Sequence, residues 1–282
     1  MTAVASPPTA ASAPPMWAPW LRIALFAARR KRLSPLAWGL GLGLMSLMIV
    51  AVFPSIQGSS QLDELIRSYP NALKEAFGIS DASFATIEGY LAAEVFSLIA
   101  PFATSYFMIH ALAAGICGSE RSGMLDVLLS APIRRRQLLA GWLAGSAATL
   151  LAIALVLAAV TQASALVLGV GLAAGDTLAG TLNLWPLGVF FGGVTLLLTG
   201  VWRRPGTVTG AAAGVLVTMY LMEVLGKLSG TMAAVDDLSA FHYYGSAIED
   251  GLDPTACAGL VAAGLLLGGA GCVLFERRDV GT

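Results

Sequence analysis

Six long apolar runs, separated by segments that hold nearly all of the charge, constrain this chain more than any other feature of its sequence. Each is close to or above the roughly 20 apolar residues that a helix needs to cross a bilayer. Lipid cannot satisfy unpaired backbone groups, and the strands of a membrane barrel would alternate polar and apolar residues. The pattern therefore predicts an all-α membrane protein with six transmembrane helices. The predicted spans lie near residues 36–54, 91–117, 139–168, 182–202, 206–227 and 255–275.

The distribution of basic residues predicts how these spans are oriented. Only 12% of the residues are charged, against roughly a quarter in soluble domains. One side of the predicted membrane receives 13 of the 16 basic residues, and the other receives only Arg67, Lys74 and Lys227. By the positive-inside rule both termini are cytoplasmic. An even number of spans agrees with this, because it places both termini on the same side. We therefore expect a multi-pass protein of the plasma or inner membrane.

The segments outside the spans predict a tail, an interfacial helix and short outer helices. Residues 1–16 hold Ala, Pro, Ser and Thr without charge, which is typical of a disordered tail, and no cleaved signal peptide is expected there. Residues 17–33 combine tryptophans with a basic end, as an amphipathic helix in the inner interface does. Within the six-span domain, 34–282, the loop 56–90 has helical spacing and is expected to cap the outer surface. The aromatic residues Phe241–Tyr244 favour an interfacial anchor over a substrate contact.

The chain lacks the motifs of an enzyme. A P-loop needs Gly-Lys-Ser/Thr, and the one lysine that follows a glycine, Lys227, precedes a leucine. Neither His110 nor His242 has a carboxylate or thiol at metal-ligand spacing, and no nucleophile elbow is present. We therefore expect no catalytic site, no metal and no cofactor on this chain. A nucleic-acid partner is not expected either.

Polar residues within the spans are costly in lipid and are candidates for a pathway. Residues of the second span fall on one face at 100° per residue, and Glu223 stands near the outer end of the fifth. The candidate pathway residues are Glu94, Ser97, Thr104, Ser105 and Glu223. A position in the outer headgroup zone explains Glu94 equally well, and packing explains His110 better than a functional role. Several glycine pairs fit the small-xxx-small pattern of close helix packing, which is weak evidence among 32 glycines.

A polar segment between the second and third spans predicts a short amphipathic helix at the inner membrane surface. Leu125, Leu128 and Leu129 line one side of it, while acidic and basic residues hold the other, and Pro132 ends it. The positive-inside rule explains the arginines that follow, but not the ordered Glu120-Arg-Ser-Gly123 start. A rigid element at the base of two spans could transmit motion from a partner. Arg29 and Arg30 join Arg134, Arg135 and Arg136 as the basic residues of this inner face.

The stretch Glu120-Arg-Ser-Gly-Met-Leu-Asp-Val-Leu-Leu-Ser-Ala-Pro-Ile-Arg-Arg136 closely resembles the coupling segment of type-2 ATP-binding-cassette (ABC) permeases. Other parts agree in order: the basic amino-terminal helix, the outer Leu-Lys-Glu-Ala-Phe-Gly78, Leu238–Tyr244 before the last span, and Phe275–Asp279. The resemblance covers the chain from about residue 17. It implies a six-helix half-transporter that dimerises and binds two copies of a separate ATPase, which would hold ATP and Mg.

In such permeases the helix between the second and third spans docks on the ATPase. That role would fall on residues 120–131, with the 17–32 helix as a second contact and re-entrant outer helices around 236–253. The resemblance assigns the coupling to Glu120, Arg121, Ser122, Gly123, Leu125, Asp126, Leu128, Leu129 and Pro132.

Members of the family export drugs, antibiotics, lipids or polysaccharides, so we expect an exporter of a drug, antibiotic or other lipophilic compound. The alternatives are a component that serves copper-enzyme maturation or mechanical signalling without bulk transport, and a proton-driven carrier dependent on Glu94 or Glu223.

Overall fold

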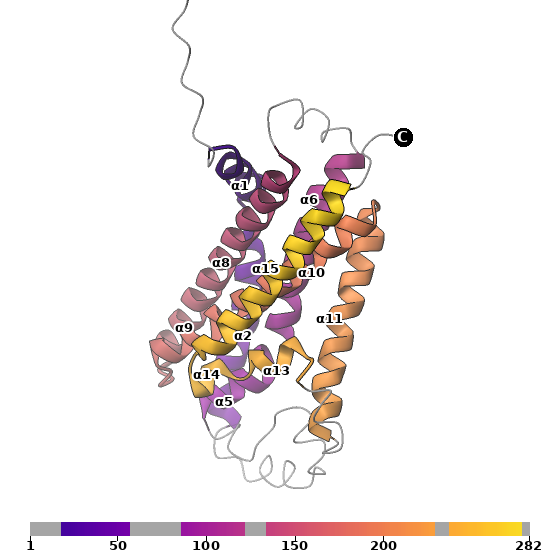
Figure 1. The fold of residues 1–282 in the computed structure, drawn as a ribbon. Helices are drawn as coiled ribbons and strands as arrows, with labels where there is room; N and C mark the ends of the chain where they lie inside the picture. The colour runs from indigo at the N-terminus through magenta and orange to yellow at the C-terminus, as the bar shows by residue number, and fades with distance from the viewer. Residues whose placement is uncertain (1–17, 57–85, 122–133, 229–236, 278–282) are drawn as a thin grey trace, which may run out of the picture.

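The computed structural model describes residues 18–56, 86–121, 134–228 and 237–277, and in these ranges it is helical without a strand (Figure 1). Six helical segments are long and apolar enough to cross a membrane, which confirms the predicted all-α membrane fold. These spans are Ser34–Ile56, Ile87–Arg121, Arg135–Leu168, Ala174–Val201, Pro205–Lys227 and Pro254–Arg277. The elements are α1 (Ala18–Arg30), α2 (Ser34–Ile56), α5 (Ile87–Leu91), the π-helix η1 (Ala92–Phe96), α6 (Ile99–Arg121), α8 (Arg135–Leu168), α9 (Ala174–Leu182), α10 (Leu184–Val201), α11 (Pro205–Leu228), α13 (Ala240–Tyr244), α14 (Ala247–Asp250) and α15 (Pro254–Arg277).

The second and fourth spans begin earlier than the apolar runs indicated. The side chain of Thr86 accepts a hydrogen bond from the Gly89 N–H at 3.2 Å, so a capped helix starts at Ile87 rather than near residue 91. The fourth span gains α9, which precedes α10 almost without interruption. Between the third and fourth spans, Gly169 adopts φ 69° and ends α8, a conformation that suits glycine. The tail 1–16 and nearly all of the loop 56–90 lie outside the described residues.

Helix α10 is the centre of the bundle, and α15 packs on it through glycines. In the most apolar 18-residue stretch of the fourth span 78% of the residues are buried, against 22% in the fifth span and 28% in the sixth. Gly193 and Gly200 of α10 face Gly264 and Gly271 of α15, and the two backbones touch directly at these positions. Close backbone approach of this kind replaces the hydrophobic effect as the source of helix association in lipid. The heptad spacing of these four glycines therefore positions α15 on the core.

Helix α1 lies beside the amino-terminal part of α8, as Figure 1 shows. Gly141 and Gly145 form a shallow surface on α8, into which Ile23 and Ala27 of α1 fit. The opposite side of α1 leaves Leu25 and Phe26 nearly half exposed. One face on the bundle and one apolar face exposed agree with a helix that lies in the membrane interface.

The other predicted glycine pairs differ in what they contact. Gly188 and Gly192 accommodate side chains of α6 and α8, and Gly264 and Gly268 meet α10. The pair on α11, Gly210 and Gly214, has no heavy atom within 4 Å of an added Cβ among the described residues. Three of the four pairs therefore serve packing within the chain, while this one lies on its surface.

Candidate functional sites at the two ends of the bundle

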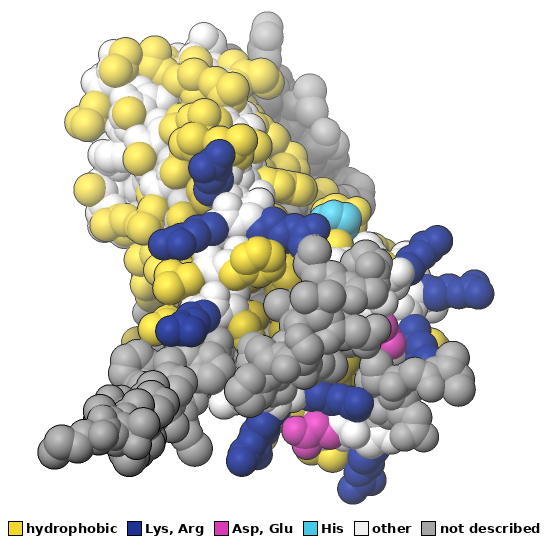
Figure 2. Space-filling view, turned by 90° about the horizontal axis from the view of Figure 1, so that it is seen from above, with side chains coloured by type: hydrophobic (Ala, Val, Ile, Leu, Met, Phe, Trp, Pro, Cys, Tyr) yellow, Lys and Arg dark blue, Asp and Glu magenta, His cyan; other side chains and the backbone are white. Residues whose placement is uncertain are grey.

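The described basic residues, apart from Lys227, gather at one end of the bundle, which we call the basic end. Viewed from above, this end carries a spread of Lys and Arg side chains (Figure 2). It is formed by α1 and the turn after it, the carboxyl ends of α6 and α15, the start of α8 and the turn between α10 and α11. The five predicted inner-face arginines lie here: Arg29, Arg30, Arg134, Arg135 and Arg136. The short elements α5, α13 and α14 lie at the opposite end (Figure 1).

Two contacts tie the borders of the predicted coupling segment to other spans. At the end of α6, the carboxylate of Glu120 lies 3.9 Å from Nε of Arg203, in the turn before α11. At the start of α8, Nη1 of Arg135 donates to the backbone oxygen of Phe275 at 3.3 Å, in the last turn of α15. A cation at a helix carboxyl terminus is stabilised by the exposed carbonyls. The two borders of the segment therefore contact the turn before α11 and the end of α15.

Two of the predicted coupling residues are described. Glu120 and Arg121 form the last turn of α6, and the Glu120 side chain is only 15% exposed. Glu120 therefore contacts Arg203 of its own chain. A direct contact of Glu120 with a partner stays a prediction. The others lie outside the described residues: Ser122, Gly123, Leu125, Asp126, Leu128, Leu129 and Pro132.

Lys31, in the turn between α1 and α2, is a partly buried cation of the basic end. Its ammonium group lies 5.4 Å from the centre of the Phe107 ring, within the range of a cation–π contact. Burial, assisted by neighbouring Arg30, lowers the pKa of Lys31 from 10.5 to about 8. This amine is therefore partly neutral at physiological pH, unlike an ordinary surface lysine.

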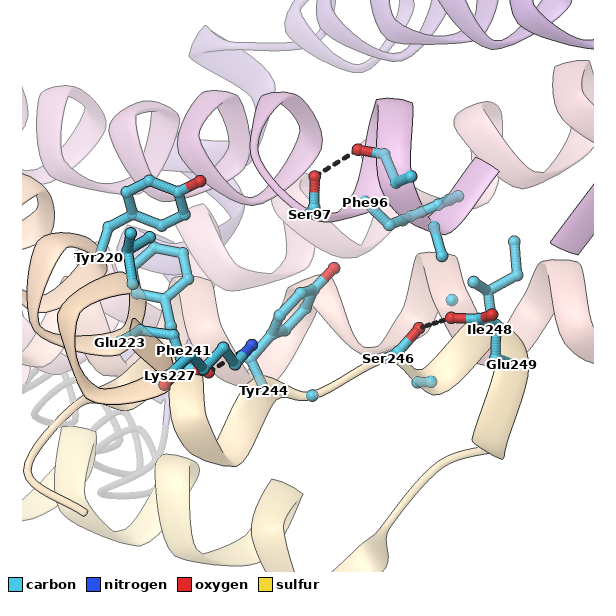
Figure 3. Close-up of a pocket in the computed structure, with 16 residues that line it drawn as sticks. Phe96, Ser97, Tyr220, Glu223, Lys227, Phe241, Tyr244, Ser246, Ile248 and Glu249 are labelled. Atoms are coloured by element: carbon cyan, nitrogen blue, oxygen red, sulfur yellow. Dashed lines mark hydrogen bonds and ion pairs between the residues drawn. The ribbon is translucent and has the colours of Figure 1, made fainter. Parts of the chain in front are cut away.

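At the opposite end a cavity of about 170 Å³ opens between η1, α11, α13 and α14 (Figure 3). We call it the Glu223 pocket. Four aromatic residues and three charged residues contribute to its wall: Phe96, Tyr220, Phe241, Tyr244, Glu223, Lys227 and Glu249. Residues from the second and fifth spans thus meet the short helices before the sixth.

The π-helix η1 shapes one side of this pocket. A π-turn widens the helix and is frequent at functional sites. Phe96 is buried at the end of η1, and the Ser97 hydroxyl, which follows, donates to the Ala93 carbonyl. Both Phe96 and Ser97 line the pocket, whereas Glu94 is exposed and does not.

The predicted polar face from Glu94 to Ser105 does not lie along one regular α-helix, and its role as a pathway lining stays a prediction. It assumed 100° per residue, and the π-helix changes that step between Glu94 and the rest of the span. Thr104 is buried and donates to the Ala100 carbonyl at 2.7 Å, and Ser105 is buried beside it. Neither lines the Glu223 pocket. His110, expected to pack inside, is exposed on the chain and stacks on Tyr106 at 6.1 Å between ring centres.

Glu223 is the most buried charged residue of the pocket. It is 7% exposed, and one carboxylate oxygen lies 2.9 Å from the ammonium group of Lys227, one helical turn further along α11. Glu249 accepts a hydrogen bond from the Ser246 hydroxyl at 2.8 Å at the mouth of the pocket. The pocket therefore combines two carboxylates with one ammonium group.

The aromatic wall is positioned by ring packing and by hydrogen bonds from side chains to backbone carbonyls. Phe241 is buried and meets Tyr220 edge-on, with ring centres 5.4 Å apart. The Asn183 side chain donates to the Tyr244 carbonyl at 2.6 Å, and the Ser239 hydroxyl donates to the Met219 carbonyl at 2.8 Å. Burial raises the pKa of Tyr244, so its hydroxyl stays protonated.

Sequence reasoning identified Glu223 and Ser97 but missed most of the pocket. The four residues 241–244 divide between two roles: Phe241 and Tyr244 line the pocket, while His242 and Tyr243 are exposed as an interfacial anchor would be. Phe96, Tyr220 and Lys227 were not predicted. The four-residue spacing of Glu223 and Lys227, which allows an ion pair on a helix, was the available signal.

The chain was also compared with known proteins. A family model described as "Multidrug efflux system permease Rv1217c, C-terminal domain" matches residues 23–276, which include five of the six described spans and all but the last residue of the sixth. A search of curated proteins found no match.

Proposed function

The chain belongs to the family of the C-terminal domain of the multidrug efflux system permease Rv1217c, and we propose that it is the membrane permease subunit of an ATP-driven exporter. It would resemble the type-2 half-transporters: a six-span subunit that forms the pathway as a dimer, with its termini in the cytoplasm. ATP and Mg would be bound by two copies of a separate ATPase. The cargo would be a drug, antibiotic or other lipophilic compound. The family match carries this proposal.

The contacts at the basic end support the coupling role. An ATPase that moves residues 120–131 would act on a segment whose two borders are joined to other spans, through Glu120 to Arg203 and through Arg135 to the end of α15. Rigid helices transmit such a displacement along their whole length. Helix α1 docks on α8 near the start of that helix, which follows the segment in the chain, so the ATPase would meet both at one end of the bundle.

The surface of α11 supports a dimer. Gly206, Gly210 and Gly214 recur every four residues on an exposed face, with no neighbour within 4 Å among the described residues. A second copy that packed there would bring two backbones close together, as small residues allow. The pathway would then lie between the two copies, beside α11.

Co-purification tests the proposal. The tagged chain, extracted from membranes in detergent, should bring down an ATPase with a P-loop in stoichiometric amount. Leu128→Glu, in the coupling segment, should lose it. Leu252→Glu serves as the matched control, because Leu252 is 42% exposed at the opposite end of the bundle, where no cytoplasmic ATPase would reach.

Absence of an ATPase from the wild-type preparation would contradict the proposal and favour the carrier or the signalling component. Retention of the ATPase by Leu128→Glu would contradict the docking role of the segment. Substrate flux in vesicles that hold both subunits then separates an exporter from a component that signals without transport.

A further inference from the structure

We propose that the Glu223 pocket is a binding site for the positively charged head group of lipophilic amines and quaternary ammonium compounds. The proposal rests on three features of the described residues: a buried carboxylate, aromatic walls, and an ammonium group of the chain that already occupies the place of a ligand cation (Figure 3). It deepens the proposed efflux function by naming a class of cargo, and it relies on that function only for the step from binding to transport.

The charges of the pocket favour a cation. Two carboxylates, Glu223 and Glu249, and one ammonium group, Lys227, line the pocket, so its ionised side chains carry a net charge of one negative unit. Removal of a carboxylate from water is costly unless an opposite charge accompanies it. At 7% exposure, Glu223 therefore needs a positive neighbour, and Lys227 provides one at 2.9 Å.

Lys227 can leave this position without losing its own solvation. Its side chain is 43% exposed, in the last turn of α11. A ligand ammonium group that entered the pocket would replace Lys227 beside Glu223, and the lysine would turn to solvent. The site would thus exchange one cation for another, so that no unpaired buried charge arises at any stage.

The aromatic walls add selectivity for organic cations over metal ions. Phe96, Phe241 and Tyr244 are buried, and Tyr220 completes the wall beside Glu223. Aromatic faces attract quaternary ammonium groups, which hold their water shell only weakly and lose it at little cost. A hydrated metal ion would gain little from such a wall, since hard cations prefer several oxygen ligands.

The size of the cavity limits what enters it. A cavity of about 150 Å³ is known to hold a benzene ring, and this one measures about 170 Å³. A whole drug needs several times more space, roughly 300–1,000 Å³. The pocket therefore takes the charged head of a larger amphiphile, while the apolar remainder would extend toward the lipid or the partner copy.

Binding of a matched pair of probes tests the proposal on the full chain in lipid nanodiscs. Benzyltrimethylammonium and neopentylbenzene have nearly the same shape and differ by one charge. After subtraction of the uptake by empty discs, calorimetry should show the cation bound at least about tenfold more tightly. Glu223→Gln should reduce this preference to within about twofold. Glu94→Gln, a change of the same kind at an exposed position of η1, should preserve it.

A second variant tests the exchange in the opposite direction. Lys227→Gln removes the competing ammonium group and should tighten cation binding several-fold. Equal binding of the two probes to the wild type, an unchanged preference in Glu223→Gln, or weaker binding in Lys227→Gln would each overturn the proposal. A chain that binds the cation but recruits no ATPase would retain this site and refute the exporter, while the reverse result would retain the exporter and refute this site.

Discussion

Substitution of Gly193 by alanine tests whether direct backbone contact holds α15 on α10. These two helices share the most extensive contact between described elements. A Cβ on Gly193 would lie 2.0 Å from the backbone oxygen of Gly264, whereas ordinary contacts begin at 3.4 Å. The shortfall is about 1.4 Å, and the obstacle is backbone, so no side chain can turn away.

The helices must therefore separate along their shared seam. Overpacking of this kind costs typically 1–3 kcal/mol, and the intrinsic preference of a helix for alanine over glycine returns about 0.5–1 kcal/mol. We expect Gly193→Ala to lower the free energy of unfolding by about 1–2 kcal/mol. Gly269→Ala on α15, where an added Cβ meets nothing within 4 Å, should raise it or leave it unchanged.

Unfolding of detergent-solubilised protein by SDS titration, followed by circular dichroism, measures both variants against the wild type. The difference in the free energy of unfolding between the two variants is the informative quantity, because the general effect of replacing glycine by alanine in a helix is the same in both. If Gly193→Ala proved as stable as Gly269→Ala, the close approach of α10 and α15 would not be the source of their association.

Three further predictions concern the basic end. Glu120→Arg should abolish drug export in vesicles that hold both subunits, and the exchanged pair Glu120→Arg with Arg203→Glu should recover part of it, since the ion pair is restored with its direction reversed. Because the pKa of Lys31 is about 8 in the folded chain, the rate of its acylation should be half-maximal near pH 8, and this midpoint should shift toward 10.5 after unfolding. The free energy of unfolding should rise with pH between these two values, because the unfolded chain binds more protons there than the folded chain. Gly145→Val places a Cβ 2.5 Å from the Ala24 carbonyl and should release α1 to protease, whereas Gly118→Val, which meets nothing within 4 Å, should not.

The spans were predictable because length and hydropathy alone define them. Their glycine contacts were only partly predictable. The four-residue pattern selected Gly141 with Gly145 correctly, but the closest approach between described helices uses the seven-residue spacing of Gly193 and Gly200. Both spacings place small residues on one helix face. The identity of the facing helix decides which spacing matters, and one sequence does not contain that information.

The Glu223 pocket was harder to predict, for two physical reasons. Its walls come from segments more than a hundred residues apart, Phe96 on one side and Tyr220 to Glu249 on the other. In addition, a π-turn has no reliable sequence signature, so a helical projection of the second span placed Glu94 and Thr104 on one face. The buried carboxylate of Glu223 was nevertheless identified, because an ionisable residue within an apolar run is costly in any arrangement.

Two helices connect the basic end with the Glu223 pocket. The second span runs from Phe96 at the pocket to Glu120 at the basic end, about 36 Å at 1.5 Å per residue. The fifth span runs back from the turn at Arg203 to Glu223. Glu120 and Arg203 join these two helices at the basic end, and Tyr220 of α11 meets Phe102 of α6 with ring centres 5.1 Å apart near the pocket.

A displacement of α6 and α11 at the Glu120–Arg203 ion pair would change the separation of these two helices near the Glu223 pocket. This change would act at the Glu223 pocket, because both helices line it, one with Phe96 and the other with Glu223. Because the Glu223 carboxylate is buried, a small separation of the two helices there would admit water and weaken its attraction for a cation. An ATPase that moved the 120–131 segment would therefore need no contact with the cargo to release it.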